Sequence, residues 1–315
     1  MSISMKVIGL VSITIFLMCS ICFAQSDRSV DEELISSALA GDTLAVKTLI
    51  DKGADINAKD KIEGATALHM ASMKGYVEIV KILIEKGADI DAKATNDATA
   101  LMTASENGHT AIVEMLLAKG AKINERANNG ASALYVASDG GHVEIVKMLL
   151  DKGAELNPKY EKGFTPLLIA SGRGHSDIVK LLIGSGADIN AKSDIGGNAL
   201  FYSSQEGRSE VVEFLLGKGM DVNSTNNNNV TALYIACQRG HEDIVKTLLE
   251  KGANPNKKSG RGISPLIVAT EKRYPAIVKL LLAHGADKNG TDNEGRTAMD
   301  WANHLGYTEI ADILK

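Results

Sequence analysis

The stretch TALHMASMKGYVEIVKILIEKGADID, residues 66–91, decides the fold, because most of the chain repeats it. Its first block, TALHMASMKG, returns in altered form as far as TAMDWANHLG near the C-terminus. A second block, which begins here as YVEIVKILIEKGADID, follows each first block. The third residues of the first blocks are spaced by 33: Leu68, Leu101, Leu134, Leu167, Leu200, Leu233, Leu266 and Met299. Eight matches at one period predict a repeat architecture.

Each first block opens with a residue that favours the start of a helix. Such N-cap residues accept a hydrogen bond from a backbone N–H group in the first helical turn. Pro166 and Pro265 follow directly, at the first helical position, where a missing N–H group does no harm. The predicted N-caps are Thr66, Thr99, Ser132, Thr165, Asn198, Thr231, Ser264 and Thr297.

The second block has the pattern of another helix. Ile145, Val146, Leu149 and Leu150 form an apolar stripe at helical spacing. Acids near the start and lysines near the end of these segments suit the helix dipole. A glycine then stands where a helix stops in a left-handed residue: Gly53, Gly87, Gly120, Gly153, Gly186, Gly219, Gly252 and Gly285.

Together the blocks resemble the ankyrin repeat, whose motif reads roughly G-x-T-P-L-H-x-A-A-x-x-G-H-x-x-I-V-x-x-L-L-x-x-G-A-D-x-N. The resemblance covers residues 31–315. It implies an all-α fold, an α-solenoid of helix-turn-helix units with β-hairpin loops and about nine helix pairs. The expected parts are an N-terminal capping unit at 31–60, seven full repeats at 61–291 and a C-terminal capping unit at 292–315.

The sequence departs from the family motif in three places. Only His69 occupies the motif's first histidine position, so a histidine network cannot run along the array. One residue is inserted between Gly53 and Leu68, which are 15 apart where later intervals are 14. The unit at 193–225 matches most loosely, and we expect lower local stability there.

Residues 1–24 have the pattern of a secretory signal peptide. Lys6 precedes an apolar run from Val7 to Phe23, and the small residue Ala24 precedes the expected cut. The run is short for a spanning helix, which needs about 20 residues, so retention as a membrane anchor is the alternative. A linker at 25–30 then leads to the array, and the chain is expected to be exported, to a periplasm or out of the cell.

Charge and cysteine content narrow the function. The chain carries 34 Lys and Arg against 39 Asp and Glu, a net charge of −5. Neutralising phosphates needs a basic surface, so nucleic acid is not an expected partner. After the expected cut Cys237 alone remains, in a position where other repeats hold serine, and it is interpreted as a packing residue. Sequons at Asn223, Asn229 and Asn289 are interpreted as turn chemistry, since the run Asn226 to Asn229 has the composition of a hairpin turn; the alternative is that they carry glycans.

His142 and Glu144 form an H-x-E pair, which in zinc deaminases joins a metal ligand to a general acid–base group. At intervals of 33 residues, however, the histidine position also holds tyrosine or arginine, and the glutamate position also holds alanine. Neither residue type is required by the repeat. The sequence therefore predicts no catalytic residue, no metal site and no cofactor.

The remaining evidence for function is that surface residues differ from one repeat to the next. The resemblance implies that partners meet the hairpin tips and the inner, concave helices. Apolar side chains edged by Arg and Lys are typical of protein interfaces. The protein-binding candidates are Phe164, Arg173, Ile195, Gln205, Val230, Gln238, Arg239, Ile263, Glu271 and Lys272. The alternative for Phe164 and Ile263 is that they only fasten their hairpins to the next repeat.

The predicted function is a monomeric, non-catalytic protein–protein interaction module or scaffold that acts outside the cytoplasm. Its partner is expected to be a protein, with no nucleic acid and no small-molecule substrate. The alternative is a membrane-tethered scaffold held by an uncleaved N-terminal helix. An enzyme or a metal-binding protein would need a constellation that breaks the repeat pattern, and none does.

Overall fold

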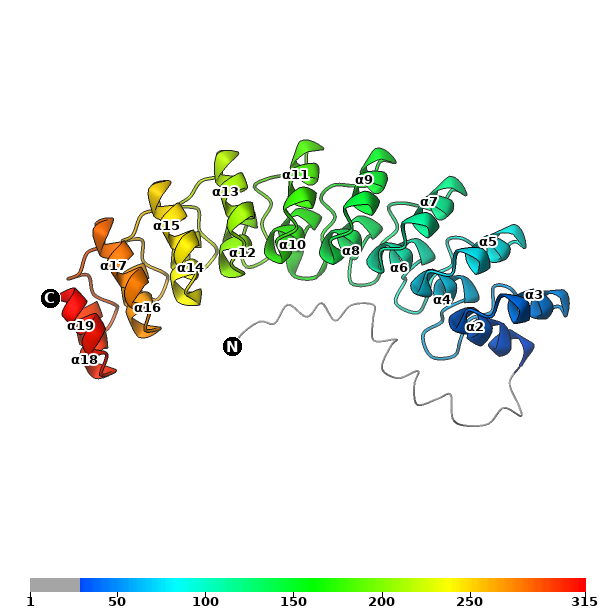
Figure 1. Cartoon of the computed structure of the whole chain (residues 1–315), viewed down its shortest axis with the longest axis horizontal. Coiled ribbons are helices and arrows are strands. Elements are labelled where there is room, and N and C mark those ends of the chain that lie inside the picture. The colour runs from blue at the N-terminus through cyan, green and yellow to red at the C-terminus, as the bar shows by residue number, and fades with distance from the viewer. Residues whose placement is uncertain (1–28) are drawn as a thin grey trace. The chain divides into compact units, whose positions relative to one another are not determined.

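The computed structural model describes residues 29–315, and Figure 1 shows them as a series of short helices. This part of the chain holds 18 α-helices, α2 to α19, and a short 3-10 helix, η2. It divides after Pro158 into two compact units, each described here by itself. The predicted signal peptide and most of the predicted linker lie outside the described residues. The predicted all-α repeat fold of nine helix pairs is confirmed.

The first unit contains four helix pairs among its described residues. The array begins one residue before its predicted start, because Ser29 caps the first helix and accepts a hydrogen bond from the Glu32 N–H group. The helices are α2 (Val30–Ala40), α3 (Thr43–Asp51), α4 (Ala67–Lys74), α5 (Val77–Glu85), α6 (Ala100–Glu106), α7 (Thr110–Ala118), α8 (Ala133–Gly140) and α9 (Val143–Asp151).

The second unit contains five helix pairs, preceded by a hairpin in which η2 (Glu161–Gly163) forms the turn. Its helices are α10 (Pro166–Arg173), α11 (Ser176–Gly184), α12 (Ala199–Gln205), α13 (Ser209–Gly217), α14 (Ala232–Arg239), α15 (Glu242–Glu250), α16 (Pro265–Glu271), α17 (Pro275–Ala283), α18 (Ala298–His304) and α19 (Thr308–Leu314).

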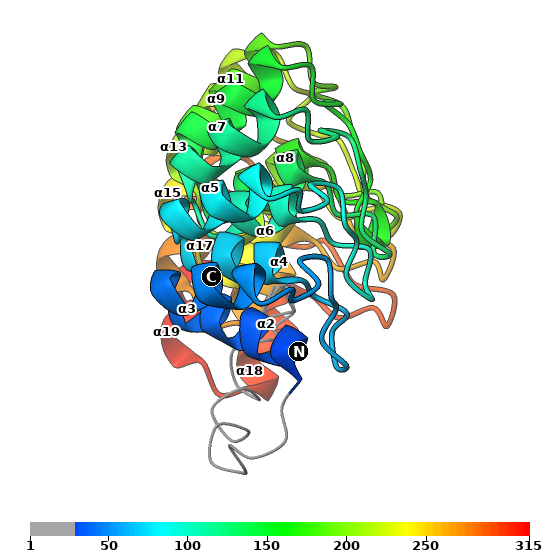
Figure 2. The same cartoon turned by 90° about the vertical axis from the view of Figure 1, so that its right-hand side faces the viewer.

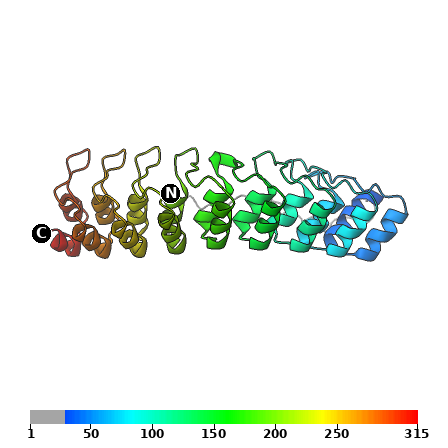
Figure 3. The same cartoon turned by 90° about the horizontal axis from the view of Figure 1, so that it is seen from above.

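Within each unit the helices form two layers. Each even-numbered helix, the first of its repeat, packs against the even-numbered helices before and after it and against its own odd-numbered partner. Figure 2 shows the two layers end-on, with the hairpin loops on the side of the even-numbered helices. Figure 3 shows the hairpins of the second unit as a row of separate projections. The hairpins therefore lie on the side of the even-numbered helices within a unit.

The predicted helix signals are confirmed. In the repeats that start at Thr99 and after it, the N-cap side chain accepts a hydrogen bond from the amide three residues later. Thr66 forms a capping box with His69 instead. The eight predicted stop glycines all have a positive φ, between 82° and 95°. Local sequence thus sets the length of each helix.

The core follows the apolar stripes of the second helices. Ile145, Val146 and Leu149 are fully buried, whereas Leu150 is only half-buried. Asparagines after these helices join neighbouring repeats: Asn223 Nδ2 donates to Gly252 O, and Asn223 Oδ1 accepts from the Asn254 N–H group at 2.7 Å. Packing and hydrogen bonds therefore couple each repeat to its neighbours.

The inserted residue lies in the first hairpin. The Asp60 N–H group donates to Ala65 O, whereas in the next hairpin the Ala94 N–H group donates to Ala98 O, one residue closer in sequence. The Asp60 carboxylate accepts backbone N–H groups within the longer turn, including that of Ala65 at 2.8 Å. The turn absorbs the extra residue, and the spacing of the helices is kept.

In the loosely matching unit at 193–225, the side chains that depart from the motif are buried or hydrogen-bonded. Ser203, where other repeats hold alanine, is fully buried, and its hydroxyl donates to Leu200 O. Met220 is buried, and the Tyr202 hydroxyl lies 2.7 Å from Ser193 Oγ. The lower local stability of this unit stays a prediction.

Candidate functional site

The histidine of the H-x-E pair joins two repeats. His142 is the N-cap residue of α9, and its Nε2 atom lies 2.9 Å from the backbone oxygen of Glu106 in the preceding repeat. The ring also lies over Gly108, which has a φ of 75° and at which a Cβ atom would come within 2.6 Å of the imidazole. The imidazole is thus engaged in the stack. The described residues contain no group of three or more His, Cys, Asp or Glu side chains placed to hold a metal ion.

The same link recurs with other residues. His109 contacts Met73 O at 2.9 Å, and His241 contacts Gln205 O at 3.1 Å. Arg208, which replaces the histidine in one repeat, donates from Nε to Gly172 O at 3.1 Å. In these repeats the side chain donates to a backbone oxygen of the preceding repeat, whereas Tyr76 and Tyr274 at the same position place a ring over Gly41 and Gly240.

The ten binding candidates lie in the second unit, on two kinds of element. Phe164, Ile195, Val230 and Ile263 belong to the hairpins, and the others to the ends of the even-numbered helices. Ile195 is the most open of the apolar candidates, with 47% of its surface exposed. The ten do not form one cluster, because they come from four successive repeats.

Phe164 serves the packing of its own hairpin. It is half-buried, and its ring centroid lies 4.8 Å from that of Tyr202 in the next repeat. This contact supports the alternative interpretation of Phe164 as a residue that fastens its hairpin to the neighbour. Its role in partner binding stays a prediction.

A groove in the second unit brings two candidates, Val230 and Gln238, together. Its volume is about 510 Å³, and it extends from the hairpin before α14 to the hairpin before α16. We call it the 226–261 groove. It is lined by Phe201, Asn226, Asn227, Asn228, Asn229, Val230, Tyr234, Ile235, Gln238, Ser259, Gly260 and Arg261.

The floor of the 226–261 groove is aromatic. Phe201 and Tyr234 occupy equivalent positions in successive repeats, where the ankyrin motif has histidine, and each is less than a tenth exposed. Burial raises the pKa of the Tyr234 hydroxyl, so the ring carries no charge at neutral pH. Phe201 is further held by an edge-to-face contact with Tyr202 at 5.4 Å.

The wall of the groove is a tightly bonded asparagine hairpin. Asn226 Oδ1 accepts the N–H groups of Asn228 and Val230 at 2.9 and 3.0 Å. The Asn227 N–H group donates to Ile195 O in the preceding hairpin, and Asn228 O accepts the Gly260 N–H group of the following one at 2.7 Å. The walls are therefore fixed by backbone contacts across three repeats.

Sequence reasoning missed several of these lining residues. The run Asn226–Asn229 was visible, but it was interpreted only as turn chemistry. Phe201 and Tyr234 depart from the histidine of the motif, which the sequence shows. The sequence does not show that their side chains lie in a groove between hairpins. The place of Arg261 in the groove could not be predicted from one repeat, because this residue belongs to the next hairpin.

The equivalent surface of the first unit is acidic. Glu106 at the end of α6 is half-buried, and burial, followed by the nearby Asp139 carboxylate, raises its pKa to about 7. Near pH 7 the Glu106 carboxyl group is therefore protonated in about half of the molecules. The surface is chemically unlike the 226–261 groove.

Other polar groups support the interpretations made from sequence. Burial raises the pKa of the Cys237 thiol, which is fully buried, so the reactive thiolate is disfavoured. The Asn223 amide is occupied by the Gly252 carbonyl, as expected of a structural asparagine. Among the helices of residues 29–315, none has both the length and the apolar character to cross a membrane.

Comparison with known proteins places matches along most of the chain. A family model described as ankyrin repeats (3 copies) matches residues 34–127, 124–193 and 191–259, and one described as ankyrin repeats (many copies) matches residues 248–302. An ankyrin repeat protein of Rickettsia felis is 36% identical over 63 residues, which are 20% of this chain and 94% of that protein.

Proposed function

We propose a protein-interaction function for this chain, which belongs to the ankyrin repeat family. In this proposal it is a non-catalytic scaffold that holds a protein partner on the hairpins and even-numbered helices of its second unit. The observation that carries the proposal is the 226–261 groove, which combines an aromatic floor with amide-rich walls between successive hairpins. Ankyrin repeats are generally binding modules, and they typically bind proteins.

The mechanism is presentation of a preformed surface. The hairpins that wall the groove are bonded to one another, as in the contact between Asn227 and Ile195. A surface that is already ordered loses less conformational entropy when a partner binds. Affinity then depends on the side chains at the tips, while the repeats keep them in register.

The proposed place of action is outside the cytoplasm, in a periplasm or secreted, and the proposed state is monomeric. The support is the signal-peptide pattern of residues 1–24, which lie outside the described part of the chain. The membrane-tethered scaffold remains the second candidate, because the same apolar run would serve as an anchor if it were not cut. Determining the N-terminal residue of the exported protein separates the two, since a start at Met1 supports the anchor and a start at Gln25 supports cleavage.

Cross-linking in the native compartment, followed by mass spectrometry, tests the interaction itself. We expect cross-links to another protein that map to the hairpins and even-numbered helices between Phe164 and Lys272. Lysines of the second helices, such as Lys246 on α15, provide the internal control, because they lie on the other layer. Partner cross-links confined to the second helices would contradict the proposed face, and the absence of any partner would contradict the function.

A further inference from the structure

We propose that the 226–261 groove binds an extended, acidic segment of a partner protein, with one aromatic or large aliphatic side chain of that segment on the groove floor. This inference rests on the proposed function and adds to it the location and the chemistry of the partner. Three features carry it: the volume of the groove above its aromatic floor, its free amide groups, and two arginines, of which Arg261 lines the groove and Arg239 follows a lining residue.

The groove as a whole has the volume of a binding pocket. Its volume of about 510 Å³ lies within the range of about 300–1,000 Å³ that is usual for binding pockets. Phe201 and Tyr234 supply the buried surface, and Val230 stands half-buried at the edge. An aromatic or large aliphatic side chain is the group that gains most from leaving water in such a place.

The groove offers free amide groups to a peptide backbone. The carboxamides of Asn228 and Gln238 line it, and neither makes a hydrogen bond to another part of the described chain. A carboxamide both donates and accepts, as does a peptide group. An extended segment leaves its backbone N–H and C=O groups available for such contacts, whereas a helix satisfies its own. The groove therefore favours an extended segment.

The charge around the groove is positive and unpaired. Arg261 lines the groove, and Arg239 follows the lining residue Gln238; both side chains are exposed, and neither has a partner within residues 29–315. The other described arginines are engaged: Arg126, Arg173, Arg208, Arg273 and Arg296. The guanidinium of Arg261 in the groove, with that of Arg239 one residue beyond its lining, is suited to carboxylates, which guanidinium groups bind through paired hydrogen bonds.

The carboxylate of Glu271 does not cancel this charge. Glu271 influences the Tyr234 hydroxyl electrostatically, but it is paired with Lys272, with 2.8 Å between Oε1 and Nζ. The side chains of Arg239 and Arg261 therefore remain available to bind Asp or Glu residues of a partner. Charge complementarity therefore selects an acidic segment over a basic or a neutral one.

Peptide display tests the inference. A random peptide library is selected on the immobilised full chain, and enriched peptides are titrated by fluorescence anisotropy. We expect these peptides to combine a net negative charge with an aromatic or large aliphatic residue. Replacing Arg239→Glu and Arg261→Glu should weaken their binding by about tenfold for each arginine, and added salt should weaken binding to the unmodified protein. Both arginines are exposed, so the melting temperature should stay unchanged.

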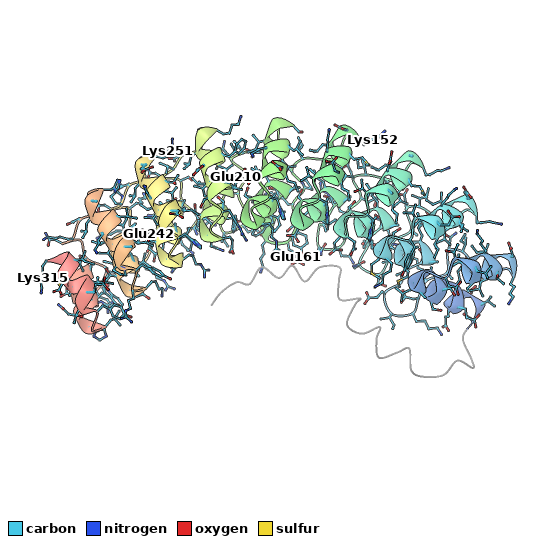
Figure 4. All side chains as sticks on the ribbon, in the orientation of Figure 1. Lys152, Glu161, Glu210, Glu242, Lys251 and Lys315 are labelled. Carbon is cyan, nitrogen blue, oxygen red and sulfur yellow. The ribbon has the colours of Figure 1, made fainter. Side chains whose placement is uncertain are left out.

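A matched control has the same change of charge elsewhere. Lys246→Glu with Lys251→Glu alters the second helix α15, where Figure 4 shows Glu242 and Lys251 at opposite ends. Neither lysine lines the groove, so peptide affinity should change by no more than about twofold. Acidic peptides that bind the arginine variant and the unmodified chain equally would overturn the inference, as would a selection that enriches no acidic peptide. In either case the proposed function would stand if cross-linking still captured a protein partner.

Discussion

The ends of α6 and α8 in the first unit and those of α14 and α16 in the second unit occupy equivalent positions in the repeat, and their net charges differ. Glu106 and Asp139 place two carboxyl groups close enough for one to raise the pKa of the other. The equivalent positions in the second unit hold Gln238 and Glu271, followed by Arg239 and Lys272. The backbone is the same in both, so the difference lies in side chains that the fold does not constrain.

This difference separates what the repeat requires from what it leaves free. The position of His142 contacts the preceding repeat in each case described: Arg208 donates to a backbone oxygen there as His142 does, and Tyr274 places its ring over Gly240. Residues at the ends of the even-numbered helices change in charge from one repeat to the next without altering the helices. Function in a repeat protein therefore has to be argued from positions that vary while the backbone stays constant.

The largest expected effect tests whether the two units have the same kind of hydrophobic core. Leu149 and Leu248 occupy the same repeat position, three repeats apart, and both are fully buried. We expect Leu149→Ala and Leu248→Ala each to reduce the free energy of unfolding by about 2–5 kcal/mol. Hydrogen exchange followed peptide by peptide measures the loss in each unit. A loss in one unit at least twice that in the other would show that the cores differ as well as the surfaces.

A smaller effect is expected from the acidic pair of the first unit. Because the pKa of Glu106 is raised from 4.5 to about 7, the folded chain holds a proton that the unfolded chain releases between these values. Stability is therefore full below pH 4.5 and falls as the pH rises towards 7. Glu106→Gln removes the ionisation and should stabilise the protein near pH 8 by about 2 kcal/mol, with no gain near pH 4. Urea unfolding at the two pH values measures this.

Glu271→Gln is the matched control for this prediction. The residue occupies the same repeat position as Glu106, but its carboxylate is paired with Lys272 at 2.8 Å. We expect its replacement to change stability by no more than about 0.5 kcal/mol. If Glu271→Gln stabilised the protein at high pH as much as Glu106→Gln did, the proposed contrast between the two surfaces would be lost.

The fold was predictable because its signals are local and recur. The N-cap at Thr231 and the stop glycine at Gly252 each follow from the conformation of one residue, and eight repetitions of such signals leave little choice of architecture. The inserted residue was predicted from spacing alone, although its place in the turn at Asp60 was not. The start of α2 at Val30 was missed by one residue, since no repeat precedes it for comparison.

The groove was less predictable, because it depends on contacts between repeats. Val230 and Gln238 were found by position, but Arg261 comes from the next hairpin and Phe201 from the preceding repeat. The direction of these side chains follows from hairpin contacts such as that between Asn228 O and the Gly260 N–H group. The pairing of Phe164 with Tyr202 was equally invisible in a single repeat.

The smallest expected effect concerns one buried hydroxyl position at which individual repeats differ, since Ser204 of the second unit also lacks a partner there within residues 29–315. Ser105 Oγ in the first unit is buried without a hydrogen-bond partner among the described residues, whereas Ser171 Oγ in the second donates to Leu167 O at 2.7 Å. An unpaired buried hydroxyl costs free energy, and a bonded one contributes a little. Ser105→Ala should therefore stabilise the protein by up to about 1 kcal/mol, and Ser171→Ala should destabilise it by about 0.5–1 kcal/mol. The buried thiol of Cys237 at the same position shows that no hydroxyl is required there. Thermal unfolding of the two variants side by side measures the difference, and a loss of stability in Ser105→Ala would mean that this hydroxyl has a partner in solution.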